Sequence, residues 1–180
     1  DAMLSFVAIS CSDNNDIVPD EVSAKQVVNL YAKQTTDRSV HPAVESGEFV
    51  KFSFKSGTIV TNDNWDIAFR GTSIIVNGGA SKGTADEPER TKSVAAYIAS
   101  GTMATITEVN AASLKQDSDT AYVLDDWYTY AGEPTHLINP TPGKILVIKT
   151  RTGNYAKVEI LSYYKDAPAE PNAFTDETPY

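Results

Sequence analysis

The stretch 144–161 reads KILVIKTRTGNYAKVEIL and consists of two apolar runs separated by a short polar turn. Gly153-Asn154 between the runs is typical of a tight hairpin, because both residues tolerate a positive φ. In the second run Lys157 and Glu159 alternate with apolar neighbours, which predicts one solvated and one packed face. The first run has four consecutive aliphatic residues at 145–148, so we expect it to be covered on both faces. This stretch predicts an antiparallel β-hairpin in the core.

Strand patterns recur along the rest of the chain, and helix patterns are scarce. A second hairpin is expected from 49–54 and 58–60, which flank a turn at Gly57. Long polar loops are expected at 77–90 and 133–143, and loops of that length often bind something. The pattern predicts an all-β fold, an antiparallel sandwich or open barrel with long ligand-binding loops. Further strands are expected at 26–34, 64–69, 72–76, 95–98, 103–109 and 123–130.

The start of the chain resembles the end of a bacterial lipoprotein signal peptide. An apolar run at 4–10 ends in small residues before the only cysteine, Cys11, and a polar acidic run follows. The apolar run is too short to span a bilayer, which takes about 20 residues. We therefore expect a partial signal peptide at 1–10, lipidation of Cys11, a polar tether at 11–24 and one β domain at 25–180. The alternative is a buried cysteine on an N-terminal strand.

Composition limits the function classes. The chain has 180 residues, 41% of them hydrophobic and 22% charged, which is typical of a globular domain. A net charge of −9 argues against nucleic acid, whose phosphates need clustered Lys and Arg. One cysteine excludes a disulfide within the chain, so the core must supply the stability.

Catalytic patterns are sparse. The two histidines, His41 and His136, share no metal-binding spacing, and no H-E-x-x-H or G-x-S-x-G is present. Asp125 and Asp126 would point to opposite faces of a strand and could not act together on one bond. We therefore predict a protein that is not an enzyme. A surface hydrolase acting on glycans is the catalytic alternative.

Three pieces of the chain together resemble the HmuY family of haem-binding outer-membrane lipoproteins. The first is Phe52-Ser53-Phe54 followed by Asn64-Trp65-Asp66-Ile67-Ala68-Phe69, similar to the family's opening hairpin and its Asn-Trp-Asp strand. The second is Ser73-Ile74-Ile75-Val76-Asn77-Gly78-Gly79 with Lys82-Gly83. The third runs from Gly153-Asn154-Tyr155 to Tyr163-Tyr164-Lys165-Asp166 and is similar to a late hairpin. Their order, together with the lipoprotein-like start, carries the resemblance.

The resemblance implies an all-β fold whose loops close on haem. It also implies a lipid-anchored protein on the outer membrane, exposed at the cell surface, that passes haem to a TonB-dependent outer-membrane transporter. One more aromatic strand would follow 166, so the resemblance implies a domain lacking its last strand. The alternative is a β-sandwich interaction module that has lost haem ligation.

The family holds haem iron with two axial His or Met side chains, since iron needs a lone-pair donor on each face. Here Gly132 occupies the place of one family histidine, and 109–122 contains neither His nor Met. His136 and Met103 are therefore the axial ligand candidates. An ordinary loop histidine and a packed methionine are the alternatives. The candidates for the pocket wall are the aromatic residues Trp127, Tyr128 and Tyr130, of which the two tyrosines share a face opposite Trp127.

Overall fold

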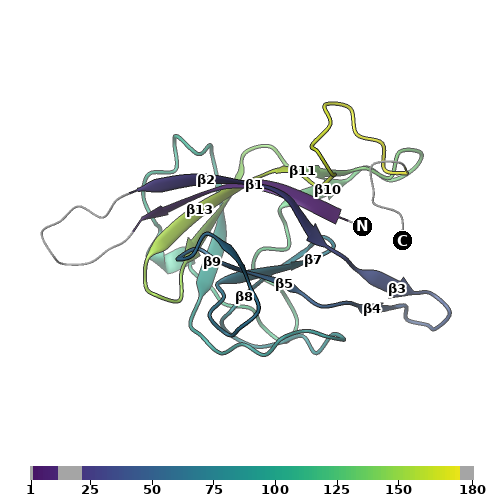
Figure 1. Cartoon of the computed structure of the whole chain (residues 1–180), viewed down its shortest axis with the longest axis horizontal. Helices are drawn as coiled ribbons and strands as arrows, with labels where there is room; N and C mark the ends of the chain where they lie inside the picture. The colour runs from purple at the N-terminus through teal and green to yellow at the C-terminus, as the bar shows by residue number, and fades with distance from the viewer. Residues whose placement is uncertain (1, 12–21, 175–180) are drawn as a thin grey trace, which may run out of the picture.

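A computed structural model describes residues 2–11 and 22–174, and it consists of two open antiparallel sheets with two small ribbons (Figure 1). The larger sheet has the order β2-β1-β13-β12-β9 and the smaller one β6-β5-β7-β8. The predicted all-β class is confirmed, as open sheets and not a closed barrel.

The larger sheet comprises β1 (Ala2–Cys11), β2 (Ser23–Ala32), β9 (Ala95–Ser100), β12 (Lys144–Lys149) and β13 (Tyr155–Ser162). The smaller comprises β5 (Val50–Ser53), β6 (Thr58–Val60), β7 (Ile67–Arg70) and β8 (Ser73–Val76). The ribbons are β3 (Thr35–Asp37) with β4 (Val44–Ser46) and β10 (Tyr128–Tyr130) with β11 (Ile138–Pro140), and Ala111–Ser113 forms a 3₁₀ turn.

The two predicted hairpins are confirmed. β12 pairs with β13 around the Gly153-Asn154 turn, with Leu146 opposite Val158, and all four aliphatic residues at 145–148 are buried. β5 pairs with β6, and the chain reverses where Gly57 adopts a φ of +66° and its N–H donates to Ser53 O at 2.8 Å. A side chain at Gly57 would meet steric strain, because L-residues rarely adopt that φ.

Aromatic side chains fill the space between the sheets. Phe6 from β1 meets Phe52 edge-on, with ring centroids 5.4 Å apart, and lies 5.5 Å from Phe69. These contacts join both sheets into one hydrophobic core. The core provides the stability that a chain without an intrachain disulfide requires.

The first strand differs from the expected leader segment. Residues of the predicted partial signal peptide form β1, which lies between β2 and β13. Leu4 and Phe6 are fully buried and Ala8 nearly so, whereas Val7 and Ile9 on the other face are partly exposed. This period-2 pattern explains why an apolar run that looks like a leader can serve as a central strand. Residues 12–21 of the predicted tether, the Cys11 side chain and residues 175–180 lie outside what the structure describes; Ser23 and Ala24 of that tether begin β2.

Three sequence-based expectations of secondary structure were wrong. Residues 103–109 form a loop, because the Lys157 ammonium takes the Met103 and Ile106 carbonyls that a strand would pair. In 123–130 only the last three residues are a strand, since the Asp117 carboxylate accepts the Val123 N–H at 2.9 Å. The expected loop 133–143 contains β11.

The Asn-Trp-Asp piece connects the two sheets. Asp66 is 1% exposed, and its carboxylate accepts the N–H of Phe54 and the N–H of Arg151, both at 2.8 Å. Trp65 is fully buried, and its carbonyl accepts the Asn77 side-chain amide at 3.0 Å. Burial raises the pKa of Asp66, and the two N–H donors partly offset that rise. The motif therefore works as a structural clasp.

Candidate functional site

The β10–β11 hairpin carries the histidine predicted as an axial ligand. His136 has a φ of +52°, uncommon for a non-glycine residue, and its N–H donates to Gly132 O at 2.7 Å. Its Nδ1 is hydrogen-bonded to the Tyr130 hydroxyl, and the two rings stack with centroids 5.9 Å apart. Phe174 meets the imidazole edge-on, with centroids 5.8 Å apart. The turn thus presents an imidazole between two aromatic rings.

This cluster is open to solvent beside a shallow apolar hollow. Tyr130 is 55% exposed and Phe174 is 72% exposed, which is unusual for large apolar rings. The hollow has a volume of about 210 Å³, smaller than a typical ligand pocket. It would therefore hold only the edge of a porphyrin-sized ring. Its lining residues are Pro134, Thr135, Leu137, Pro171, Asn172, Ala173 and Phe174.

A haem iron would find one fitting donor here. When the Nδ1–H donates to the Tyr130 oxygen, Nε2 of His136 keeps a lone pair for a metal, the arrangement common among metal-ligating histidines. The residues that line the adjacent hollow include no His, Met, Cys or Tyr. His136 together with this hollow therefore fits one axial position of haem.

The other predicted wall residues divide between core and surface. Trp127 is 2% exposed, and its Nε1–H donates to Thr72 O at 2.8 Å, so it belongs to the core and not to an open wall. Tyr128 packs on Trp127 with centroids 5.0 Å apart and is half-buried. Of the three aromatic candidates, Tyr130 is the one that contacts His136.

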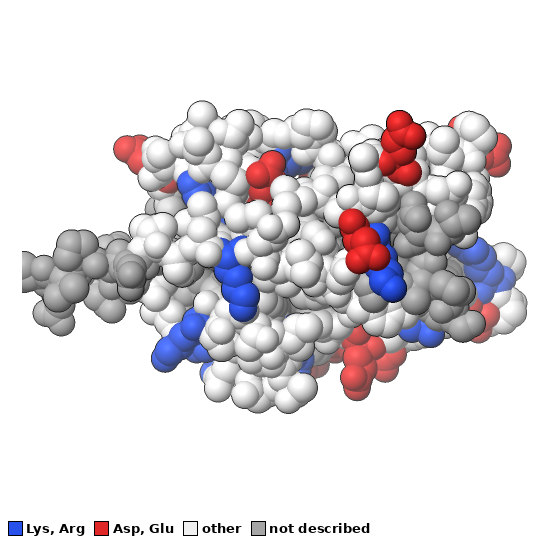
Figure 2. All heavy atoms as spheres, turned by 45° about the horizontal axis from the view of Figure 1, so that its top comes forward, with Lys and Arg blue, Asp and Glu red and all other residues white. Residues whose placement is uncertain are grey.

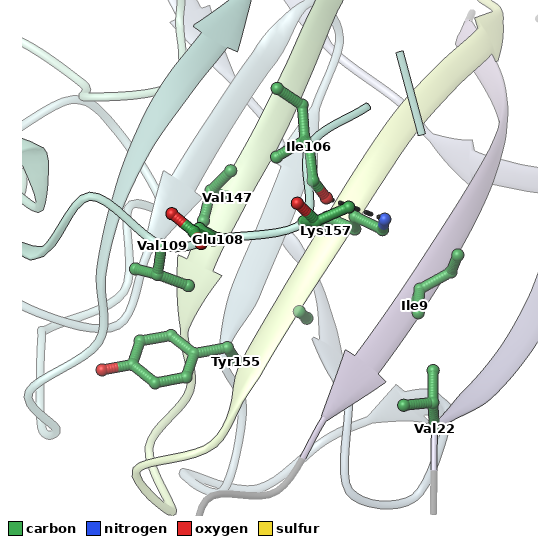
Figure 3. Close-up of a pocket in the computed structure, with 10 residues that line it drawn as sticks. Ile9, Val22, Ile106, Glu108, Val109, Val147, Tyr155 and Lys157 are labelled. Carbon is green, nitrogen blue, oxygen red and sulfur yellow. Dashed lines mark hydrogen bonds between the residues drawn. The ribbon is translucent and has the colours of Figure 1, made fainter. Parts of the chain in front are cut away.

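Met103 lies in a different loop, beside a groove on the outer face of the larger sheet. The groove has a volume of about 300 Å³ and is mainly apolar (Figure 3). Lys157 crosses its floor and donates to the backbone oxygens of Met103 and Ile106, at 2.9 Å for Ile106, which fastens the loop to the sheet. The groove and the hollow beside His136 share no lining residue. The described contacts thus do not bring the two axial candidates together.

A buried ionic cluster anchors the long loop 77–94, and no sequence pattern predicts it. The Arg90 guanidinium contacts the carboxylates of Glu87 at 2.8 Å and Asp117 at 3.0 Å, and all three side chains are almost fully buried. Burial opposes ionisation of Glu87, but hydrogen bonds from Thr84, Lys82 and Tyr122 outweigh it and lower its pKa to about 2. Burial raises the pKa of Asp117. Glu87 lies close to Arg90 in sequence, but Asp117 is 27 residues away from Arg90, too far for a spacing motif to reveal the cluster.

The glycine pair of the second family-like piece is explained by close packing. A Cβ at Gly78 would lie 2.1 Å from Val94 O, and one at Gly79 would lie 2.0 Å from Asp117 O. Only glycine permits this approach of two backbones. The close approach of Gly78 to Val94 brings the two ends of the anchored loop together, and the ionic cluster holds the middle of the loop.

Two kinds of feature are absent from the described part of the chain. No group of three or more His, Cys, Asp or Glu there could hold a metal ion, and no helix there is long and apolar enough to cross a membrane. Asp126 is exposed and pairs with Lys144 at 2.7 Å. On the face shown in Figure 2, Lys and Arg side chains are separated by uncharged surface.

Comparison with known proteins gives one result. The family model described as HmuY protein matches residues 45–175, which is most of the chain and includes all three family-like pieces. No curated protein and no solved structure matches significantly. HmuY proteins are binding proteins rather than enzymes; they bind haem and are typically surface lipoproteins. The chain belongs to the HmuY family.

Proposed function

We propose that this protein captures haem or a related tetrapyrrole outside the cytoplasm and that the β10–β11 hairpin is its capture site. Family membership is the observation that carries the proposal. His136 supports it locally, because its Nδ1 has an oxygen partner and its Nε2 can serve as a ligand. Haem, when bound, supplies the iron that this nitrogen would ligate.

The chain's own residues have distinct parts in this proposal. Tyr130 orients the imidazole through the hydrogen bond at Nδ1, and Nε2 is free to ligate when Nδ1 carries the proton. Phe174 and Leu137 offer apolar surface to the edge of the macrocycle. Met103 is the second axial candidate, and it would need the loop 101–110 to move towards the hairpin, because the two donors now lie in separate loops.

A titration tests haem binding directly. Haemin added to the purified chain should shift and sharpen the Soret band at micromolar concentration, with saturation at one haem per chain. An unshifted band across that range contradicts the proposal. It would favour the alternative of an interaction module without haem ligation. The core position of Trp127, which removes it from a pocket wall, supports that alternative.

Anchoring and delivery form a separate part of the proposal. A transporter that takes haem would be a TonB-dependent outer-membrane protein, and copurification from a membrane extract tests that contact. Lipidation of Cys11 requires cleavage before it, and cleavage would remove the buried Leu4 and Phe6 from the core. The mass of the N-terminal peptide from cells decides between a lipidated Cys11 and an intact β1.

A further inference from the structure

A cavity at the opposite end of the larger sheet from the β10–β11 hairpin has the character of a second ligand site. It lies between the beginning of β2 and the β5–β6 turn, and it has a volume of about 350 Å³. This volume falls at the lower end of the range for small-molecule pockets. The cavity shares no lining residue with the hollow beside His136.

The floor of this cavity is formed by apolar side chains. Phe52 is 2% exposed and Phe54 is 9% exposed, and their rings meet edge-on with centroids 5.4 Å apart. Ala8 from β1 and Val27 from β2 complete the floor. The first three side chains belong to the core between the sheets and Val27 packs against that core, so the floor is part of the fold itself.

The rim of the cavity is cationic. Lys25 and Lys55 are the charged residues among its lining, although acidic residues outnumber basic ones in the chain by 24 to 15. The Lys25 ammonium donates to Gly57 O, which holds it at the rim and leaves further N–H donors for a ligand. Among the lining residues that the structure describes, no carboxylate competes for the two ammonium groups.

We propose that this cavity binds a free amphiphilic carboxylate of the fatty-acid type. The alkyl chain would cover Phe54 and Val27, and the carboxylate would accept hydrogen bonds from Lys25 and Lys55. A neutral apolar molecule would leave the ammonium groups unpaired, and a small hydrophilic anion would leave the floor uncovered. The proposal does not depend on haem binding at His136.

Calorimetric titration with dodecanoate, below its aggregation concentration, tests the proposal. Saturable binding at one site is expected, with dodecanol and acetate each at least about tenfold weaker, since each keeps only one of the two interactions. The double variant Lys25→Glu/Lys55→Glu should lose about tenfold or more in affinity. The control Lys92→Glu/Lys165→Glu makes the same change in net charge at exposed positions outside the cavity, and it should bind normally.

A second variant fills the cavity without touching the core. Ala24 is an exposed lining residue of β2, so Ala24→Trp should block the cavity, reduce dodecanoate binding at least about tenfold and leave the unfolding midpoint nearly unchanged. The proposal is overturned if dodecanoate shows no saturable binding, if dodecanol binds equally well, or if both double variants weaken binding to the same extent. Binding only to vesicles that contain anionic lipid would also overturn it, because the lysines would then serve a membrane surface.

Discussion

The carboxylate of Asp66 accepts the backbone N–H of Arg151 at 2.8 Å, across a sequence separation of 85 residues. The same carboxylate accepts the Phe54 N–H, so it connects the β5–β6 turn of one sheet with the β12–β13 turn of the other. A buried acceptor with two backbone donors is costly to remove, because each donor then loses its partner.

Replacement of this carboxylate should destabilise the fold. Asp66→Asn keeps the shape but places an amide N–H against one of the two donors, and we expect a loss of about 1–3 kcal/mol in the free energy of unfolding. Urea unfolding followed by tryptophan fluorescence measures it. The neighbouring exposed Asp63→Asn is the control and should be nearly neutral. Equal effects of the two substitutions would show that Asp66 is not a clasp.

The first strand should contribute to stability as a core element. Leu4→Ala removes a fully buried side chain between the sheets, and we expect a loss of about 2–5 kcal/mol. Val7→Ala on the outer face of the same strand should cost less, because Val7 is partly exposed. The measurement is the unfolding midpoint of protein recovered from cells. No effect of Leu4→Ala there would mean that residues 1–10 are removed before the domain matures.

The buried Glu87 should make the free energy of unfolding depend on pH in the acidic range. Its pKa is lowered from 4.5 to about 2, so its contribution is present above pH 4.5 and is lost as the pH falls towards 2. The raised pKa values of Asp66 and Asp117 act in the opposite direction, since their native carboxyl groups bind protons more tightly than the unfolded ones.

Comparison of variants isolates this contribution. The difference in unfolding free energy between the wild type and Glu87→Gln should be largest near pH 6 and shrink below pH 4.5. Glu89→Gln changes an exposed neighbour and should give a small difference at every pH. A Glu87→Gln difference that stays constant down to pH 2 would contradict the role of Glu87.

Lys157 should control the mobility of the loop beside the groove. Lys157→Met keeps the stem on the sheet but removes the donor to the Met103 and Ile106 carbonyls. Asn110 lies in this loop, and its amide donates to the Tyr97 hydroxyl of β9. Hydrogen exchange at that amide should become about tenfold faster while exchange in β12 is unchanged. Lys149→Met on the same sheet is the control. An unchanged Asn110 rate would show that other contacts hold the loop.

The sequence predicts most of the fold because its strongest patterns are local. The period-2 alternation in 155–161 and the continuous apolar run at 145–148 depend on neighbours along the chain, and both strands form as expected. The loop at 103–109 was missed because Lys157, about fifty positions later, determines its conformation. Composition does not distinguish the end of a signal peptide from a central strand, so the sequence pattern at 1–10 predicts the one while the structure has these residues in β1.

The candidate site is less predictable than the fold for a similar reason. His136 was selected from its residue type and approximate position, but its pairing with Tyr130 depends on a left-handed turn that the sequence does not specify. Trp127 was expected at a pocket wall, yet the Thr72 carbonyl holds it in the core. The family-like pieces mark the residues that build the fold, whereas the donors for a ligand lie in the loops between them.

The central claim is that His136 provides an axial ligand to haem iron, and one comparison of haemin complexes tests it most directly. Soret spectra are recorded for the wild type, His136→Ala and the loop control His41→Ala, each with and without added imidazole. We predict that His136→Ala alone loses the wild-type band and that imidazole restores it, because the missing nitrogen is then supplied from solution. A wild-type spectrum for His136→Ala would contradict the claim.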